Sequence, residues 1–222
     1  DQLPKVSEID PDAPPTSIVL ASMGVDTTDL VITNGLKIWQ RTMPIGGNNF
    51  TRALVQGMRM TFAKAENLKR NAARADDPKK VFQTLRPVFN EFASELQRSL
   101  NYFTGQDRTA KIGQVLLVGN AAKLRGLSDF LAKQLQLEVH RLREFKSLEG
   151  DRVLKAPVFR ENQLGFATVY GLCLQGLGVS SIRTNLLPSD VTRDRLIQAK
   201  KPWAVAAMLG LLVAALINFF GI

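Results

Sequence analysis

The sequence predicts an α/β domain followed by one helix that spans a membrane. Three patterns support this prediction: a β-hairpin around residue 34, a strand–helix–strand unit over residues 114–140, and an uncharged run over residues 202–222. The chain has 222 residues, of which 45% are hydrophobic and 22% are charged. That length and composition are enough for one globular domain with a real hydrophobic core.

The hairpin prediction depends on Asn34-Gly35, which joins two β-prone runs, residues 30–33 and residues 36–40. This dipeptide tolerates positive φ at both central turn positions and is therefore the strongest short-range hairpin signal. An ordinary hairpin followed by an amphipathic helix is the simpler interpretation of each piece taken alone.

A glycine turn precedes the hairpin. We expect the turn at Gly24 to leave backbone N–H groups free, with the hydroxyls of Thr27 and Thr28 beside them. A loop of this kind binds anions in many proteins, although a single Gly-Thr turn is a weak signal.

A long helix is predicted over residues 50–70, with Asn48 or Asn49 as its cap, because apolar residues recur there at helical spacing. Glu66 and Lys69 form an i,i+3 pair near its end. Taken alone, this pair indicates a solvated helix face worth a few tenths of a kcal/mol.

A second helix is expected to begin at Pro78, because proline in the first turn loses no hydrogen bond that the helix needs. Pro87 should kink or split this helix. Apolar residues at i+3 and i+4 spacing predict a face that packs into the core rather than against a partner. They are Val81, Leu85, Val88, Phe92, Leu96 and Phe103.

The strand–helix–strand unit consists of an apolar strand over residues 114–118, a helix over residues 127–136 and a strand over residues 137–140. Such a unit implies parallel pairing and a right-handed crossover. Ligands bind such units at the carboxyl ends of the strands, so residues 119–123 are predicted to lie at a pocket edge.

The chain carries a net charge of +9, which fits a solvated surface, a nucleic-acid partner or an anionic membrane face. No basic motif interleaved with aromatic residues is present, so we expect no nucleic acid. The single cysteine, Cys173, lies between two leucines and is interpreted as a buried small hydrophobe that fits a reducing compartment. Neither Cys173 nor the single histidine, His140, has partners at metal-ligand spacing, so no metal site of these residues is expected.

Residues 202–222 contain no charged side chain, and only Asn218 is strongly polar. A bilayer core needs about 20 apolar residues in a helix, so a single span is predicted, with Trp203 at its boundary. An apolar core helix is the alternative. The tract before the span is rich in lysine and arginine, so the positive-inside rule predicts that residues 1–201 face the cytoplasm.

Four segments match one known family in sequence and order: Thr28-Asp29-Leu30-Val31, Pro44-Ile45-Gly46-Gly47, Phe50-Thr51 and Ala65-Glu66-Asn67-Leu68-Lys69. Residues 17–178 thereby resemble the second half of the actin-like ATPase fold. They are most similar to the branch that holds the cell-division protein FtsA and the type IV pilus assembly protein PilM, and the sequences of these segments resemble PilM most closely.

The resemblance implies ATP and Mg in the full-length protein. It implies a nucleotide site formed by Ser22, Gly24, Thr27, Thr28, Glu66, Lys69, Gly119, Asn120 and Ala121. Glu66 would approach the ribose, and Gly119-Asn120-Ala121 the adenosine end. Ser22 stands where the family has the phosphate-turn aspartate, and Asn120 where it has a second glycine. The first phosphate loop belongs to the family's amino-terminal half, so we expect no catalytic residue and at most very weak ATP binding here.

Asn185-Leu186-Leu187-Pro188 resembles the amino-terminal motif of PilN, a short peptide that docks on PilM and precedes a transmembrane helix. An ordinary linker loop is the alternative. The implied organisation is a linker or cut edge over residues 1–16, an actin-like domain over residues 17–178, a PilN-like motif with a basic tract over residues 179–201, and the span.

Two functions follow from these resemblances. The first is a membrane-anchored scaffold of the type IV pilus inner-membrane platform, with PilN- or PilO-like partners and possible homo-oligomers. The alternative is an ATP-hydrolysing protein of FtsA type, or a component of a type II secretion platform similar to GspL.

Overall fold

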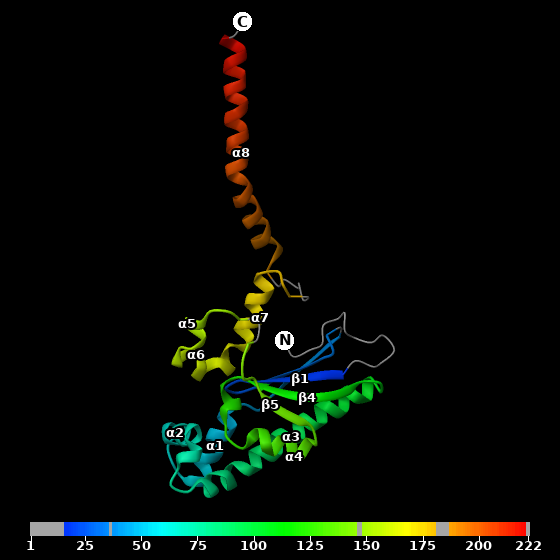
Figure 1. The fold of residues 1–222 in the computed structure, drawn as a ribbon, viewed down its shortest axis with the longest axis vertical. Coiled ribbons are helices and arrows are strands. Elements are labelled where there is room, and N and C mark those ends of the chain that lie inside the picture. Colours follow the sequence, from blue (N-terminus) through cyan, green and yellow to red (C-terminus); the bar gives the residue numbers. More distant parts are fainter. Residues whose placement is uncertain (1–15, 36, 146–147, 181–186, 221–222) are drawn as a thin grey trace. The chain divides into compact units, whose positions relative to one another are not determined.

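A five-stranded mixed sheet forms the centre of the first part of the chain (Figure 1), in the order β3-β2-β1-β4-β5. The central strand β1 (Thr16–Met23) pairs antiparallel with β2 (Thr28–Thr33) and parallel with β4 (Lys111–Val118). The edge strands are β3 (Ile38–Met43) and β5 (Glu138–Arg141), the latter parallel to β4. Several residues of β1 and β4 are fully buried because helices and neighbouring strands enclose this pair.

The computed structural model describes residues 16–35, 37–145, 148–180 and 187–220. The chain divides into two units, residues 1–172 and residues 173–222. The predicted parallel strand–helix–strand unit is confirmed, with α4 (Leu127–Leu135) between β4 and β5.

The predicted hairpin is confirmed, but its turn differs from the expected two-residue type. The strands close at the pair Thr33↔Ile38, which leaves four residues in the loop. Gly35 has a φ of 90°, whereas Asn34 keeps negative φ and accepts a hydrogen bond from the Lys37 N–H at 2.8 Å. The asparagine therefore shapes the loop through its side chain rather than through a left-handed backbone. Leu36 lies outside the described residues.

The single helix predicted over residues 50–70 is wrong, because the chain forms α1 (Gly47–Met58) and α2 (Phe62–Arg70). Arg59 ends α1 in the left-handed region with a φ of 52°, and its N–H donates to the Val55 carbonyl. This backbone turn ends a helix in the usual way, but without the glycine that normally signals it in a sequence. Apolar periodicity continued across the break and concealed it.

The cap of α1 also differs from the prediction. Gly46 occupies the N-cap position, and Asn49 lies three residues later within the helix. The Asn49 side-chain oxygen accepts from the Gly46 N–H at 3.0 Å, so this asparagine still stabilises the helix start.

The long helix α3 (Pro78–Gln106) begins as predicted, and the Asp77 side chain accepts from the Lys80 N–H at 3.0 Å. It continues through Pro87 without a break, so the expected split does not occur. Leu85 and Val88, on either side of the proline, are both buried, and this packing offsets the lost hydrogen bond. The rest of the predicted apolar stripe is also buried, apart from the partly buried Phe103.

Several short helices follow or separate these elements. The segments after β5 were not predicted, because they lack a clear apolar period. The elements are η2 (Ala72–Arg74), η3 (Asn120–Lys123), α5 (Asp151–Leu154), α6 (Pro157–Asn162), η4 (Gln163–Phe166) and α7 (Ala167–Gly176).

Cys173 is exposed, so its predicted burial is wrong. None of the residues of α7 is buried, and the apolar surroundings that the flanking leucines suggested are therefore absent from the described structure.

In the second unit, α8 (Ser189–Phe220) is a 32-residue helix that passes through Pro202. Its most apolar window has a mean hydropathy of 2.2, and none of its residues is buried. Within residues 16–35, 37–145, 148–180 and 187–220, it is the one helix long and apolar enough to cross a membrane. It begins in the basic tract, thirteen residues before the predicted span starts at Pro202.

Candidate functional site

The candidate site is a cavity that lies where the parallel strands β1 and β4 end. Ser22 and Val118 pair at the carboxyl ends of these strands, and the chain then turns at Gly24 and Gly119. A cavity of about 730 Å³ opens between these turns, with walls from α1, α2, η3 and η4. Its position matches the expectation that a ligand binds beyond the carboxyl ends of parallel strands.

The structure brings most of the sequence-predicted nucleotide residues to this cavity. Seven of them line it: Ser22, Gly24, Glu66, Lys69, Gly119, Asn120 and Ala121. Thr27 and Thr28 do not. Residues that lay in no recognised motif complete the wall, among them Phe62, Leu164 and Gly165. Phe62 precedes Glu66 by one turn of α2, whereas Leu164 and Gly165 come from the distant η4, and no motif marked any of them.

The turn at Gly24 uses one of its own amides. The Gly24 N–H donates to the Thr27 carbonyl at 2.8 Å. Thr28 is fully buried, and its hydroxyl donates to the Ile45 carbonyl at 2.7 Å. Thr28 thus holds the glycine loop against the start of β2 rather than presenting its hydroxyl to a ligand.

The Gly46-Gly47 loop packs directly on this turn. A Cβ on Gly46 would lie 2.6 Å from the Val25 carbonyl oxygen, so a larger residue would push the two segments apart. The Gly47 N–H donates to the Gly24 carbonyl at 3.0 Å, and the Asn48 N–H donates to the Val25 carbonyl at 2.7 Å. The first amides of α1 are therefore used within the protein and are not open to an anion.

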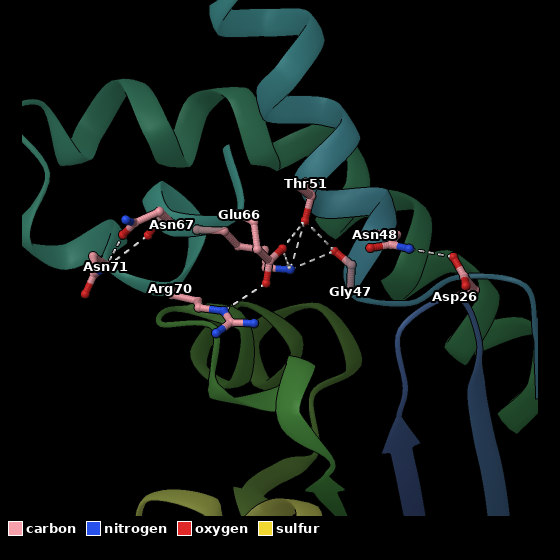
Figure 2. A network of polar contacts seen from close by, with 9 residues as sticks. Asp26, Gly47, Asn48, Thr51, Glu66, Asn67, Arg70 and Asn71 are labelled. Carbon is pink, nitrogen blue, oxygen red and sulfur yellow. Dashed lines mark hydrogen bonds and ion pairs between the residues drawn. The ribbon is translucent and has the colours of Figure 1, made fainter. Parts of the chain in front are cut away.

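A polar network connects α1 with α2 at one wall of the cavity (Figure 2). Glu66 Oε2 lies 2.7 Å from Lys69 Nζ and accepts from the Thr51 hydroxyl at 2.7 Å, while Glu66 Oε1 accepts from Arg70 Nε at 3.0 Å. Lys69 Nζ also donates to Thr51 Oγ1 at 2.9 Å and to the Gly47 carbonyl at 3.1 Å.

This network is not a solvated surface pair. The side chain of Lys69 is 12% exposed and that of Glu66 is 26% exposed, so the interpretation as a solvated helix face is wrong. Burial raises the pKa of the Glu66 carboxyl, but hydrogen bonds from Lys69, Thr51 and Arg70 outweigh it and lower the pKa to about 2. Glu66 is therefore an anion at every physiological pH, and its charge is already neutralised by its own neighbours.

The opposite wall depends on Gly119. Its φ is 88°, and a Cβ there would lie 2.3 Å from the Met23 carbonyl oxygen. Only glycine permits this close approach of the two turns. The Gly119 N–H donates to the Leu164 carbonyl at 2.7 Å, which attaches η4 to the cavity. Asn120 lies beside Gly165, where a Cβ would come within 3.4 Å of the Asn120 side-chain oxygen.

The cavity suits the uncharged part of a nucleotide better than a metal-bound phosphate. Its volume is sufficient for such a ligand, and Glu66 Oε1, to which Arg70 is the one donor among the described residues, can accept a further hydrogen bond from a hydroxyl group. For magnesium the donors do not fit: Ser22 is neutral, Glu66 is occupied by three donors, and Asp26 accepts from the Asn48 side chain at 2.8 Å. Among the described residues, no group of three or more His, Cys, Asp or Glu side chains is placed to hold a metal ion.

The family model of the type IV pilus assembly protein PilM matches residues 5–177. A solved PilM-PilN type IV pilus biogenesis complex is 26% identical, with a TM-score of 0.63, over 74% of this chain and 47% of that one. The chain thus spans about half of the length of that structure.

Other solved structures are more distant. The ethanolamine utilization protein EutJ from Carboxydothermus hydrogenoformans is 24% identical, with a TM-score of 0.47, over 55% of this chain and 43% of that one. A non-polymerising MamK mutant bound to AMPPNP is 15% identical, with a TM-score of 0.47, over 66% of this chain and 52% of that one. No curated protein matches the sequence.

Proposed function

Because this chain belongs to the type IV pilus assembly protein PilM family, we propose that it is a membrane-anchored, actin-like scaffold of a pilus assembly platform. One observation carries the proposal: the family match ends at residue 177, and the same chain continues into a helix long and apolar enough to cross a membrane. The actin-like fold expected from the sequence is confirmed, with the two strand ends and the glycine turns in their expected order.

The anchoring part of the proposal depends on α8. Its apolar portion follows a tract with Arg193, Arg195, Lys200 and Lys201, and such a tract remains on the cytoplasmic side of a membrane. We therefore place the actin-like domain in the cytoplasm. Asp190 and Asp194 also lie in the tract, but acidic residues contribute little to this preference.

A PilN-like partner is the second part of the proposal. The solved structure of a PilM-PilN complex is similar to this chain, and the Asn185–Pro188 motif resembles PilN. Asn185 and Leu186 lie outside the described residues. Leu187 is 42% exposed just before α8. Pro188 biases Leu187 toward extended geometry, which lowers the ordering cost of docking as a peptide on a PilM-type domain.

Nucleotide binding is proposed to be degenerate. The cavity supplies a glutamate for a ribose and a glycine turn for a base, but no open carboxylate for magnesium. We expect the full-length protein to bind the adenosine end of ATP and to hydrolyse it slowly or not at all. Ser22→Asp should strengthen magnesium-dependent binding, measured by calorimetry, whereas Ser22→Asn should not, because it adds no charge.

Protease accessibility in sealed inner-membrane vesicles tests the scaffold function. With the cytoplasmic face outward, we expect digestion of residues 16–180 and protection of the apolar part of α8. A chain that stays in the soluble fraction, or a domain protected in these vesicles, would contradict the proposal. A Leu186→Ala, Leu187→Ala variant should remain anchored but lose co-purification with platform proteins, which separates docking from insertion.

A further inference from the structure

A second cavity of about 600 Å³ lies beside the first, and the two share Lys123 and Leu164 in their walls. Its walls come from η3, the start of α4, the end of β5 and α6. No sequence motif pointed to it. Its most conspicuous property is the number of cationic side chains that line it.

Lys123, Arg141, Arg143 and Arg160 all line this cavity, although they come from segments that are well separated in the sequence. Within residues 16–35, 37–145, 148–180 and 187–220, none of the four forms an ion pair within 4.0 Å or a side-chain hydrogen bond. Four positive charges around one concave surface favour an anion there, and the two carboxylates in the same wall, Asp129 and Glu161, offset only part of this charge. Arginine also matches the oxygen geometry of phosphate by donating two hydrogen bonds at once.

The start of α4 adds to this positive field. Gly126 is the N-cap and provides no side-chain cap, and the Phe130 N–H donates to its carbonyl at 2.9 Å. Ser128 and Asp129 lie within this first turn and line the cavity. Helix N-termini carry a partial positive charge, so α4 reinforces the attraction for an anion that the arginines create.

Two carboxylates in the wall of this cavity limit which anions it can bind. Asp129 and Glu161 line the same cavity, and neither is paired with a lysine or arginine in the described part of the chain. They oppose a ligand that is anionic throughout, but they accept hydrogen bonds from hydroxyl groups. His140 also lines it and faces Glu138, with 3.4 Å between its Nε2 and the Glu138 carboxylate.

We propose that this cavity binds a small phosphorylated molecule that carries hydroxyl groups, such as a sugar phosphate or a nucleotide. The phosphate contacts the arginines and the start of α4, and Asp129 and Glu161 accept hydrogen bonds from the hydroxyls. This site adjoins the proposed nucleotide cavity and shares Lys123 and Leu164 with it, but the proposal does not depend on nucleotide binding there.

The test uses the 222-residue chain in detergent, with inorganic pyrophosphate as the probe in calorimetry. Arg141→Gln with Arg160→Gln should weaken binding about tenfold or more, because two charge-assisted contacts are lost. Arg108→Gln with Arg125→Gln is the matched control: these exposed arginines lie outside both cavities, so binding should be unchanged. Arg141→Lys with Arg160→Lys should recover part of the affinity, since the charge returns without the planar fork.

Equal binding by the glutamine variant and the wild type would overturn the proposal, as would no detectable binding by the wild type. A decamer of glutamate that binds where pyrophosphate does not would overturn it in favour of an acidic peptide. For the hydroxyl contacts, glucose 6-phosphate should bind more tightly than methyl phosphate. Asp129→Asn with Glu161→Gln should alter that preference, and an unchanged ratio would overturn this part.

Discussion

The two cavities of the actin-like domain differ in whether the cationic side chains in their walls are paired with a carboxylate. In the first, Lys69 and Arg70 are both paired with Glu66 at 2.7 and 3.0 Å. In the second, Arg141, Arg143 and Arg160 line the wall without an ion pair among the described residues, as does Lys123, which the two cavities share. One group of charges is satisfied by the fold, and the other is not.

This difference separates a structural role from a ligand-binding role. The charges of the first cavity join α1 to α2 and fix the shape of the wall before any ligand arrives, so they contribute to folding stability. The charges of the second cavity contribute little to stability and remain available to an anion. The comparison therefore predicts that equivalent substitutions have different effects in the two places.

The largest effect should come from Lys69→Met. It removes the ammonium group and leaves Glu66 partly buried with Arg70 as its only cation, so the free energy of unfolding should fall by about 2–3 kcal/mol. Urea denaturation at pH 7 measures this value. Lys64→Met, on the exposed face of the same helix, is the control and should change it by less than about 0.5 kcal/mol. An equal effect of both variants would remove the distinction between the cavities.

Acid should also lower the free energy of unfolding, because it protonates the same Glu66 carboxylate. The folded-state pKa of Glu66 is about 2, below its ordinary value of 4.5, so its stabilising contribution is complete above pH 4.5 and is lost as the pH falls toward 2. After allowance for solvent screening, the contribution is about 1–2 kcal/mol. The stability difference between wild type and Glu66→Gln should therefore shrink between pH 5 and pH 3. A difference that stays constant over this range would contradict the pairing.

The next prediction concerns the buried hydrogen bond between the Thr28 hydroxyl and the Ile45 carbonyl. Thr28→Val removes the hydroxyl that donates to the Ile45 carbonyl and leaves that carbonyl without this partner, at a cost of about 1–1.5 kcal/mol. Thr27→Val, at an exposed position in the same turn, should cost less than about 0.5 kcal/mol. Chemical denaturation of both variants compares them directly. Comparable losses would mean that the turn is held by propensity and not by the buried hydroxyl.

The smallest effect belongs to the second cavity. Arg141→Gln with Arg160→Gln should raise the free energy of unfolding by a few tenths of a kcal/mol at low salt, because it relieves repulsion between unpaired cations. The gain should disappear in about 1 M NaCl, where the screening length is near 3 Å. A loss of stability at low salt would show that these arginines have structural partners, and the comparison would fail.

Much of the fold could be predicted from local patterns. Asn34-Gly35 marked the hairpin, Asp77-Pro78 marked the start of α3, and the apolar run before Gly119 marked β4. The break at Arg59 could not be predicted in this way, because a left-handed helix end needs no glycine when its backbone hydrogen bonds are satisfied. The course of α3 through Pro87 depended on packing that no local pattern records.

The sequence by itself determined the order of the elements, the resemblance to PilM and the apolar run within α8, because turns, periodicity and composition are local properties. Only the tertiary structure decided how the side chains are used. Glu66 and Lys69 look like a surface pair until Thr51 and Gly47 enclose them. The second cavity gathers arginines from β5, the segment after it and α6, and charges so far apart in the chain become a site only when folding brings them together.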